Sequence, residues 1–184
     1  MVKKRIPTRE ECLKLMDQYG MLENIIGHSI EVARVALFLS RELNKRGQRI
    51  DLLLVEAASL LHDLTKTESF KTQEDHAWTG SELLKEIGYE RVGEVVAQHI
   101  WLSHDVDPAR VSEEEVVNYA DKRVMHDRIV SLEERLADLR DRYGRDQRAI
   151  DYLGRMEKVI QEIENKIFLI LQIDPDDLQC LQEE

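Results

Sequence analysis

Residues 60–66 read LLHDLTK, so that an apolar helical segment ends in an adjacent imidazole and carboxylate, followed three residues later by an amine. The pair is His62 and Asp63, and the amine is Lys66. A His-Asp dipeptide is common by chance. Its meaning therefore depends on which other polar side chains the chain brings to the same place.

Four further groups of the same kind stand on the apolar faces of other predicted helices. They are His28, His76, His99 and Asp121. A buried polar group costs free energy unless a partner satisfies it, and for His28, His62, Asp63 and Asp121 no lysine or arginine stands at a matching position. A shared metal would satisfy these groups together. For any single histidine the alternative is a hydrogen-bonded core or rim residue, and we assign His104 and His126 to that class.

The ligand types narrow the choice of metal. Imidazole and carboxylate donors without thiolates suit Fe, Mn, Ni, Co or Zn, with Mg as a further option. Four histidines and two aspartates are enough for two ions, and Asp63 is the expected bridging ligand because it is central among the set. The donor set is therefore large enough for two divalent ions, although the residues alone do not fix their number.

Composition and charge restrict the class of protein. The chain has 184 residues, of which 42% are hydrophobic and 34% charged, as expected of one helical domain with charged surfaces. The formal net charge of −11 argues against a surface that grips a nucleic-acid polymer through its phosphates. A small ligand, including a phosphorylated one held by local cations, is the expected partner.

The sequence offers no sign of a membrane or an oxidising environment. No apolar run approaches the roughly 20 residues that cross a bilayer, and the start MVKKRIPTREEC has no hydrophobic segment behind its basic residues. The only two cysteines, Cys12 and Cys180, lie near opposite ends of the chain. We therefore expect a cytoplasmic protein without disulfide bonds or membrane contact.

Hydrophobic periodicity predicts an all-α fold. Apolar residues recur every three or four positions over 26–46, 52–64 and 76–87, and from 113 onward. Thr8, Asp51, Asp75 and the Ser112 with Glu115 pair provide N-cap signals for helices. Residues 65–73 are polar and predict a loop. No alternating strand pattern of useful length is present.

The C-terminal part predicts a helical hairpin. A narrow stripe of Leu132, Leu136, Leu139 and Tyr143 runs to a break at Gly144. A heptad seam then follows from Ala149 to Ile170. We divide the chain into residues 1–130, with a core of about 20–130, and an extension over 131–184. The extension is expected to pack on the domain or on a second copy, which would make a homodimer.

The order of these motifs resembles the HD-domain superfamily of metal-dependent phosphohydrolases. Its pattern of a histidine, a His-Asp doublet and a distant aspartate matches His28, His62, Asp63 and Asp121. The surrounding segments agree, namely HSIEVARVALFLS (28–40), AASLLHDLTK (57–66), DHAWTGSELLKEIGY (75–89), VVAQH (95–99) and NYADKRV (118–124). His76 and His99 resemble the additional histidines of the dinuclear branch, which implies a helical bundle with a two-metal site.

This resemblance implies hydrolysis of a phosphate ester by water activated at the metals. Asp63 and Lys66 would act in catalysis, and Lys66, Lys122 and Arg123 would stabilise the charge of a nucleotide or another small phosphomonoester. The GYP motif of cyclic-dinucleotide phosphodiesterases is absent, and the doublet continues as LTK rather than toward the acidic pair of alarmone hydrolases. The alternatives are a non-catalytic metal- or nucleotide-sensing module and a di-iron oxygenase of the same fold.

Overall fold

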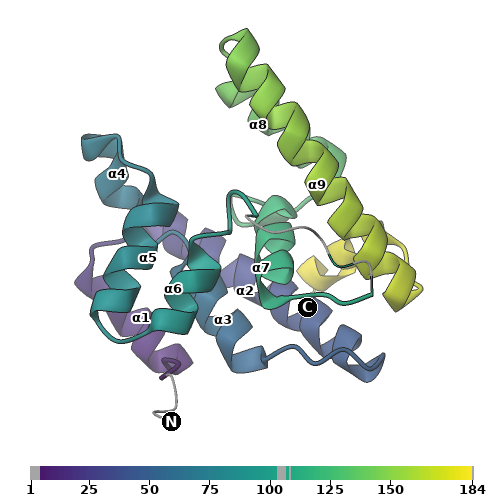
Figure 1. Ribbon diagram of the computed structural model, residues 1–184, viewed down its shortest axis with the longest axis horizontal. Helices are drawn as coiled ribbons and strands as arrows, with labels where there is room; N and C mark the ends of the chain where they lie inside the picture. The colour runs from purple at the N-terminus through teal and green to yellow at the C-terminus, as the bar shows by residue number, and fades with distance from the viewer. Residues whose placement is uncertain (1–4, 103–106, 108, 184) are drawn as a thin grey trace.

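The computed structural model describes residues 5–102, 107 and 109–183. Over these residues the chain is helical apart from one pair of two-residue strands (Figure 1). The predicted all-α class is confirmed. None of the helices in these ranges is both long and apolar enough to cross a membrane.

Most of the elements follow one another with short connections. The helices are α1 (Arg9–Gln18), α2 (Glu23–Lys45), α3 (Leu52–Leu61), α4 (Lys66–Thr72), α5 (His76–Glu86), α6 (Glu90–Val96), α7 (Glu113–Lys122), α8 (Leu132–Tyr143) and α9 (Gln147–Leu171). The strands β1 (Val124–Met125) and β2 (Arg128–Ile129) pair antiparallel, and a 3-10 helix, η1 (Pro175–Glu183), follows α9. The N-cap signals act as expected: Thr8, Asp51, Asp75 and Ser112 each accept from backbone amides of the first helical turn.

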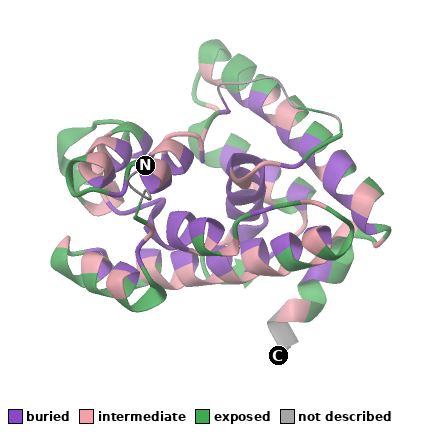
Figure 2. Cartoon of the chain, turned by 60° about the horizontal axis from the view of Figure 1, so that its bottom comes forward, coloured by how far each residue is buried: buried purple, intermediate pink, exposed green. Residues whose placement is uncertain are grey.

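The core forms where α2 packs against α3 and α7, while α5 pairs with α6 beside them. Figure 2 shows buried residues along the inward faces of the helices and exposed residues on their outer faces. Ala33, Ala36, Ala57 and Ala58 are buried, and their small side chains allow close helix approach. This packing fixes the ends of α2, α3 and α7, where the predicted ligands stand.

One predicted loop is a helix. Residues 65–73 were expected to be irregular because they are polar, but Lys66–Thr72 form α4, which buries none of its residues. Gln73 then ends the helix in the left-handed conformation, with φ of 60°. The segment contains no glycine or proline to prevent helix formation, and polarity alone did not separate a surface helix from a loop. Lys66 is consequently the first residue of a helix that begins three residues after Asp63.

The predicted C-terminal hairpin is present. Helices α8 and α9 run side by side, and α9 continues back toward α2 and α7 (Figure 1). The seam residues Leu153, Met156, Ile160, Ile163 and Ile167 are buried. The apolar stripe of α8 is shorter than predicted, because Leu132, Leu136 and Leu139 are buried whereas Tyr143 is 53% exposed.

A buried ion pair also joins α9 to α7. The Lys166 ammonium lies 2.7 Å from both carboxylate oxygens of Glu115, and it donates to the backbone oxygens of Asp107 and Arg110 at 2.8 Å. The Lys166 side chain is 6% exposed and that of Glu115 is 1% exposed. Glu115 also accepts from the backbone amide of Ser112, in the capping box that begins α7. The extension is thus fixed to the helix that carries Asp121.

Removing the chain after Arg128 should therefore destabilise what remains. The shorter protein would expose the apolar surface that Ile160, Ile163 and Ile167 cover, and each fully buried isoleucine contributes about 1.5–3 kcal/mol. Thermal unfolding and solubility of the two lengths measure the effect. A truncated protein that is fully soluble and equally stable would contradict a packing role for the extension.

Candidate metal centre

The predicted ligands converge from helix ends that are far apart in the sequence. His28 stands near the start of α2, His62 caps the C-terminus of α3, and His76 is the first residue of α5. Asp63 directly follows His62, His99 follows α6, and Asp121 lies near the end of α7. Helix ends suit such a site because the packed helices hold the backbone rigidly while the side chains point into a common space.

Two groups of ligand atoms share Asp63. His28, His62 and Asp63 form one group, and Asp63, His76 and His99 form the other, with the ligand atoms of each group within 4.8 Å of one another. His76 Nε2 lies 3.1 Å and His99 Nε2 lies 3.7 Å from Asp63 Oδ1, whereas His62 Nε2 lies 3.4 Å from Oδ2. Each oxygen of Asp63 thus faces a different group, which is the arrangement that a bridging carboxylate requires.

Asp121 lies beside the first group. Its Oδ1 is 3.0 Å from His28 Nε2 and 3.6 Å from His62 Nε2. The carboxylate could therefore join His28, His62 and Asp63 around one ion. The second group has no such neighbour among the described residues, and there His99 Nε2 and His76 Nε2 lie 3.3 Å apart.

Backbone carbonyl groups orient three of the imidazole rings. The Nδ1 atoms of His28, His62 and His99 lie 2.9, 2.7 and 2.7 Å from the backbone oxygens of His126, Ser59 and Val96. A carbonyl oxygen can only accept, so Nδ1 carries the proton in each ring. In the neutral rings the Nε2 lone pair then points toward the aspartates, as it does in a metal-binding histidine.

The centre contains buried polar atoms without a hydrogen bond. His62 Nε2 and Asp63 Oδ1 are buried, and neither has a hydrogen-bond partner within the described part of the chain. An unsatisfied buried nitrogen and carboxylate oxygen are costly in a folded protein. A divalent cation would satisfy both, and the imidazole and carboxylate donors around them are those that such cations take. The residues therefore fit the predicted metal site.

The charge states agree with this interpretation. Burial alone would raise the pKa of Asp63, but the neighbouring His62, His76 and Lys66 outweigh burial and hold the pKa well below its usual range. Burial and the neighbouring His62 lower the pKa of His99 well below its usual value, so this ring is neutral. For His62 burial lowers the pKa, but Asp63 and Asp121 outweigh it and raise the pKa to about 10. A cation at this position would compete with that proton.

The structure corrects the expectation that no lysine pairs with these aspartates. Lys66 Nζ lies 2.6 Å from Asp63 Oδ2, and Lys122 Nζ lies 2.6 Å from Asp121 Oδ2. Both pairings depend on local geometry that helix periodicity does not reveal, because Lys66 begins the unexpected helix α4 and Lys122 is adjacent to its partner. The Lys66 side chain is 31% exposed, whereas that of Lys122 is 5% exposed and also donates to the backbone oxygen of His99.

Two of the predicted substrate contacts, Lys122 and Arg123, are buried and hydrogen-bonded to other parts of the chain. Lys122 is buried behind Asp121, where its ammonium orients the carboxylate. Arg123 is fully buried, and its guanidinium donates to the backbone oxygens of Val130 and Pro175 and to the Tyr119 hydroxyl. These bonds fix the chain around β2 and η1. We therefore assign no substrate contact to either residue.

His126, which the sequence analysis placed among hydrogen-bonded core or rim residues and not in the site, borders the centre. It lies in the turn between β1 and β2 with φ of 59°, and its backbone oxygen accepts from His28 Nδ1. Periodicity missed it because it lies outside helix α7 and no local signal marks the turn. His104, which we also assigned to no site, falls outside the described residues.

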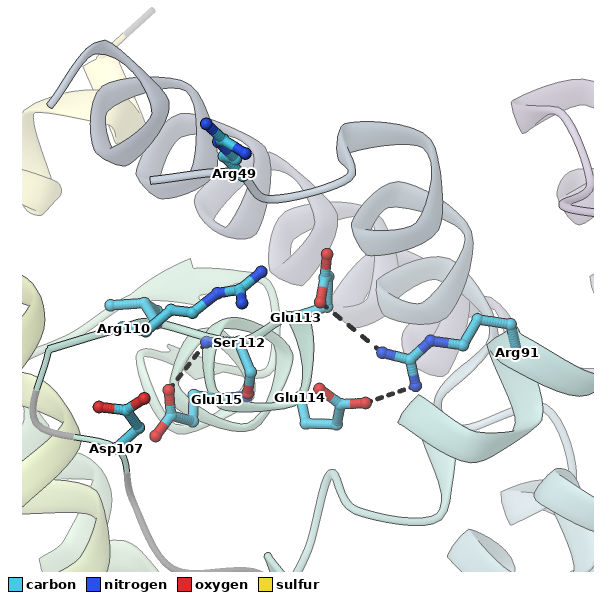
Figure 3. Close-up of a pocket in the computed structure, with 9 residues that line it drawn as sticks. Arg49, Arg91, Asp107, Arg110, Ser112, Glu113, Glu114 and Glu115 are labelled. Carbon is cyan, nitrogen blue, oxygen red and sulfur yellow. Dashed lines mark hydrogen bonds and ion pairs between the residues drawn. The ribbon is translucent and has the colours of Figure 1, made fainter. Parts of the chain in front are cut away.

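A cleft with a volume of about 240 Å³ opens beside the centre. His28, Asp63 and Lys66 line it together with His126 and residues of α4 and α8. Another hollow, of about 280 Å³, lies at the N-terminus of α7 (Figure 3). There Arg91 pairs with Glu113 and Glu114, and the described lining includes none of the expected ligands. Of these two hollows, only the first is lined by expected metal ligands, namely His28 and Asp63.

These features define a helical domain with a histidine–aspartate cluster that could hold metal ions. The match to known families is more specific: the family described as "HD domain" matches residues 25–156. The chain belongs to this family. The match extends beyond residue 130, where we placed the domain boundary, and includes α8 and part of α9.

Several curated proteins are similar to parts of the chain. The tRNA (cytidine(56)-2'-O)-methyltransferase of Thermoplasma volcanium is 33% identical over 53% of this chain and 27% of its own. The protein of the same name from Picrophilus torridus is 28% identical over 87% of this chain and 47% of its own. Ribonuclease Y of Acetivibrio thermocellus is 36% identical over 46% of this chain and 14% of its own. The chain thus spans less than half the length of each of these relatives. No solved structure matches it significantly.

Replacing His76 or His99 by alanine should remove one metal and keep the other. These two histidines contact only the Oδ1 side of Asp63, so the group formed by His28, His62 and Asp63 remains. Metal content should fall by about half in a two-metal site. Elemental analysis measures it, with Glu82→Gln on the same helix as His76 as a matched control. Unchanged metal content in both variants would indicate that His76 and His99 are hydrogen-bonded core residues and not metal ligands.

Proposed function

We propose that the protein hydrolyses a small phosphate ester, with divalent metals held by His28, His62, Asp63, His76, His99 and Asp121. The observation that carries this proposal is that Asp63, which belongs to both ligand groups, lines the same cleft as the part-exposed Lys66. A phosphate entering that cleft meets the predicted metals and an ammonium group together. Membership of the HD-domain family also supports metal-dependent phosphohydrolysis as the general type of activity.

The residues of the chain would have different roles in this reaction. Divalent metals at such ligands polarise phosphoryl oxygens and lower the pKa of water. Asp63 would contribute to both metal positions, because it belongs to both ligand groups, and Lys122 keeps the Asp121 carboxylate oriented. Lys66 is the substrate contact, because its ammonium lies at the cleft and can stabilise negative charge on the phosphoryl group.

RNA is the second candidate substrate, because several relatives are named ribonuclease Y. A ribonuclease would cleave a phosphodiester with the same kind of metal chemistry. The net charge of −11 and the small cleft favour a small ester over a polymer. A test that offers both kinds of substrate separates them.

The experiment measures phosphate release from small esters and strand cleavage of RNA by protein loaded in turn with Fe, Mn, Ni, Co, Zn or Mg. The panel contains nucleoside monophosphates, sugar phosphates and a short RNA. Turnover of the small esters in heavy-oxygen water should place the label on the released phosphate, since the water attacks phosphorus. Label found only on the alcohol product would rule out attack at phosphorus. Cleavage of the RNA alone would favour the second candidate, and inactivity with every metal would reject the proposal.

Lys66→Ala should lose activity while keeping its metals. The ammonium contacts Asp63 Oδ2 but is not itself a ligand, so its removal leaves the donor set complete. The loss of one charge-stabilising group typically costs about 10²–10³ in kcat. Elemental analysis and turnover are measured on the same samples, with Lys71→Ala on the exposed side of α4 as control. Loss of metal in parallel with activity would show that Lys66 supports the centre rather than the substrate.

A further inference from the structure

Helix α8 forms one wall of the cleft that leads to the predicted metals. Arg135, Leu139, Arg142 and Tyr143 line this cleft opposite residues of α2 and α4. They belong to the extension over residues 131–184, to which no sequence motif assigns a function. The cleft is therefore incomplete without the extension.

Hydrogen bonds hold this wall against the metal centre. Arg142 Nη2 lies 3.3 Å from the ring nitrogen Nε2 of His126, and the backbone oxygen of His126 accepts from His28 Nδ1. Asp138 stands between two arginines, with carboxylate oxygens 2.7 Å from Arg135 Nη1 and 2.7 Å from Arg142 Nε. The position of α8 is thus linked through His126 to an expected metal ligand, His28.

The wall makes the cleft locally positive. Lys66, Arg135 and Arg142 line it, and the carboxylate that lines it is that of Asp63. Asp138 neutralises part of this charge, but two guanidinium groups share its single carboxylate. The rest of the protein is acidic, with a net charge of −11. A local excess of cations on an acidic protein directs anions to this cleft, and Arg142, whose side chain is 43% exposed, is accessible to them.

Two exposed aromatic rings border the same cleft. Phe70 of α4 is 59% exposed and Tyr143 of α8 is 53% exposed. Tyr143 falls at a position where helix periodicity predicted burial, so its exposure is a consequence of where α8 ends. Aromatic side chains beside cationic groups form the usual binding surface for a nucleobase attached to a phosphate.

We propose that α8 is the substrate-recognition wall, in which Arg142 binds the phosphate and Tyr143, together with Phe70, contacts the base of a nucleoside monophosphate. This inference rests on the proposed function for the reaction at the metals, but binding does not require turnover. Arg135 acts as a positioning residue, because its guanidinium is held by Asp138 and is 13% exposed. A sugar phosphate without a base would use Arg142 but not the aromatic rings.

The test is calorimetric binding of adenosine 5′-monophosphate and of ribose 5-phosphate to the metal-loaded protein. Arg142→Ala should weaken both ligands about tenfold or more, since a charge-assisted hydrogen bond is lost. Tyr143→Ala should weaken only the nucleotide, by about tenfold or more, and Tyr143→Phe should keep wild-type affinity because the ring remains. Arg148→Ala, an exposed arginine of α9, is the control for the loss of one positive charge. The affinity of Arg142→Gln and the unfolding temperature of each variant show whether a loss of binding comes from a folding defect.

Separate outcomes decide the two proposals. Unchanged affinity in both Arg142→Ala and Tyr143→Ala would overturn the inference. The inference would also be overturned if the wild type bound the two ligands with equal affinity, or if it did not bind the nucleotide. Selective binding losses without release of phosphate from the nucleotide would support the recognition wall and reject the proposed hydrolysis. Release of phosphate that is insensitive to both variants would support hydrolysis and reject the wall.

Discussion

Asp63→Asn should deprive the protein of both metals and of all metal-dependent activity. Asp63 is the ligand that the two groups share, and its two oxygens face different histidines. Asparagine has nearly the same size but carries no charge, and its amide nitrogen cannot act as a second oxygen donor. The affinity of each metal should fall by more than the 10–100-fold that changes outside the first ligand shell cause. No other single replacement is expected to affect both positions equally.

Elemental analysis and a metal titration measure this effect. Asp141→Asn, which removes a carboxylate from α8 outside the ligand groups, controls for the change of charge. The comparison with His76→Ala is the more informative one, because loss of one metal there and of both in Asp63→Asn identifies the bridging ligand. Stoichiometric metal at wild-type affinity in Asp63→Asn would reject the assignment of the centre.

The sequence predicted much of the site because its signals are local. Each of His28, His62 and Asp121 stands on a helix face whose other members are apolar, and helix periodicity alone shows that such a residue points inward. Packed helices then leave little choice of where inward-pointing groups can meet. The convergence of these side chains followed from the all-α fold together with the order of the motifs.

What the sequence did not reveal depends on contacts between distant segments. The carbonyl of His126 reaches His28 across 98 residues, and the positive φ of this turn has no signal in the sequence. Tyr143 is exposed because α8 ends at the cleft, although its spacing matched the buried leucines. The sequence predicts Arg123 as a residue that stabilises substrate charge, but its guanidinium donates to the backbone oxygens of Val130 and Pro175, next to β2 and at the start of η1. Tertiary packing decides each of these cases.

Lys166→Met should lower the free energy of unfolding by about 3–5 kcal/mol, the usual cost of breaking a buried ion pair by removing one partner. Methionine fills a similar volume, so the loss comes from the Glu115 carboxylate, which would remain buried without its cation, and from two backbone oxygens that lose their donor. Denaturant unfolding followed by circular dichroism measures it. Lys158→Met, at an exposed position of the same helix, should change stability by less than about 0.5 kcal/mol.

The double variant Lys166→Met with Glu115→Gln distinguishes this explanation from a simple packing defect. Removing both charges should recover much of the lost stability, because a neutral amide is far less costly to bury than an unpaired carboxylate. Since Glu115 lies in the capping box of α7 and α7 carries Asp121, the single variant should also reduce metal affinity, whereas Lys158→Met should not. A single variant as stable as the wild type, or a double variant less stable than the single one, would show that the extension is not coupled to the metal-bearing helix through this pair.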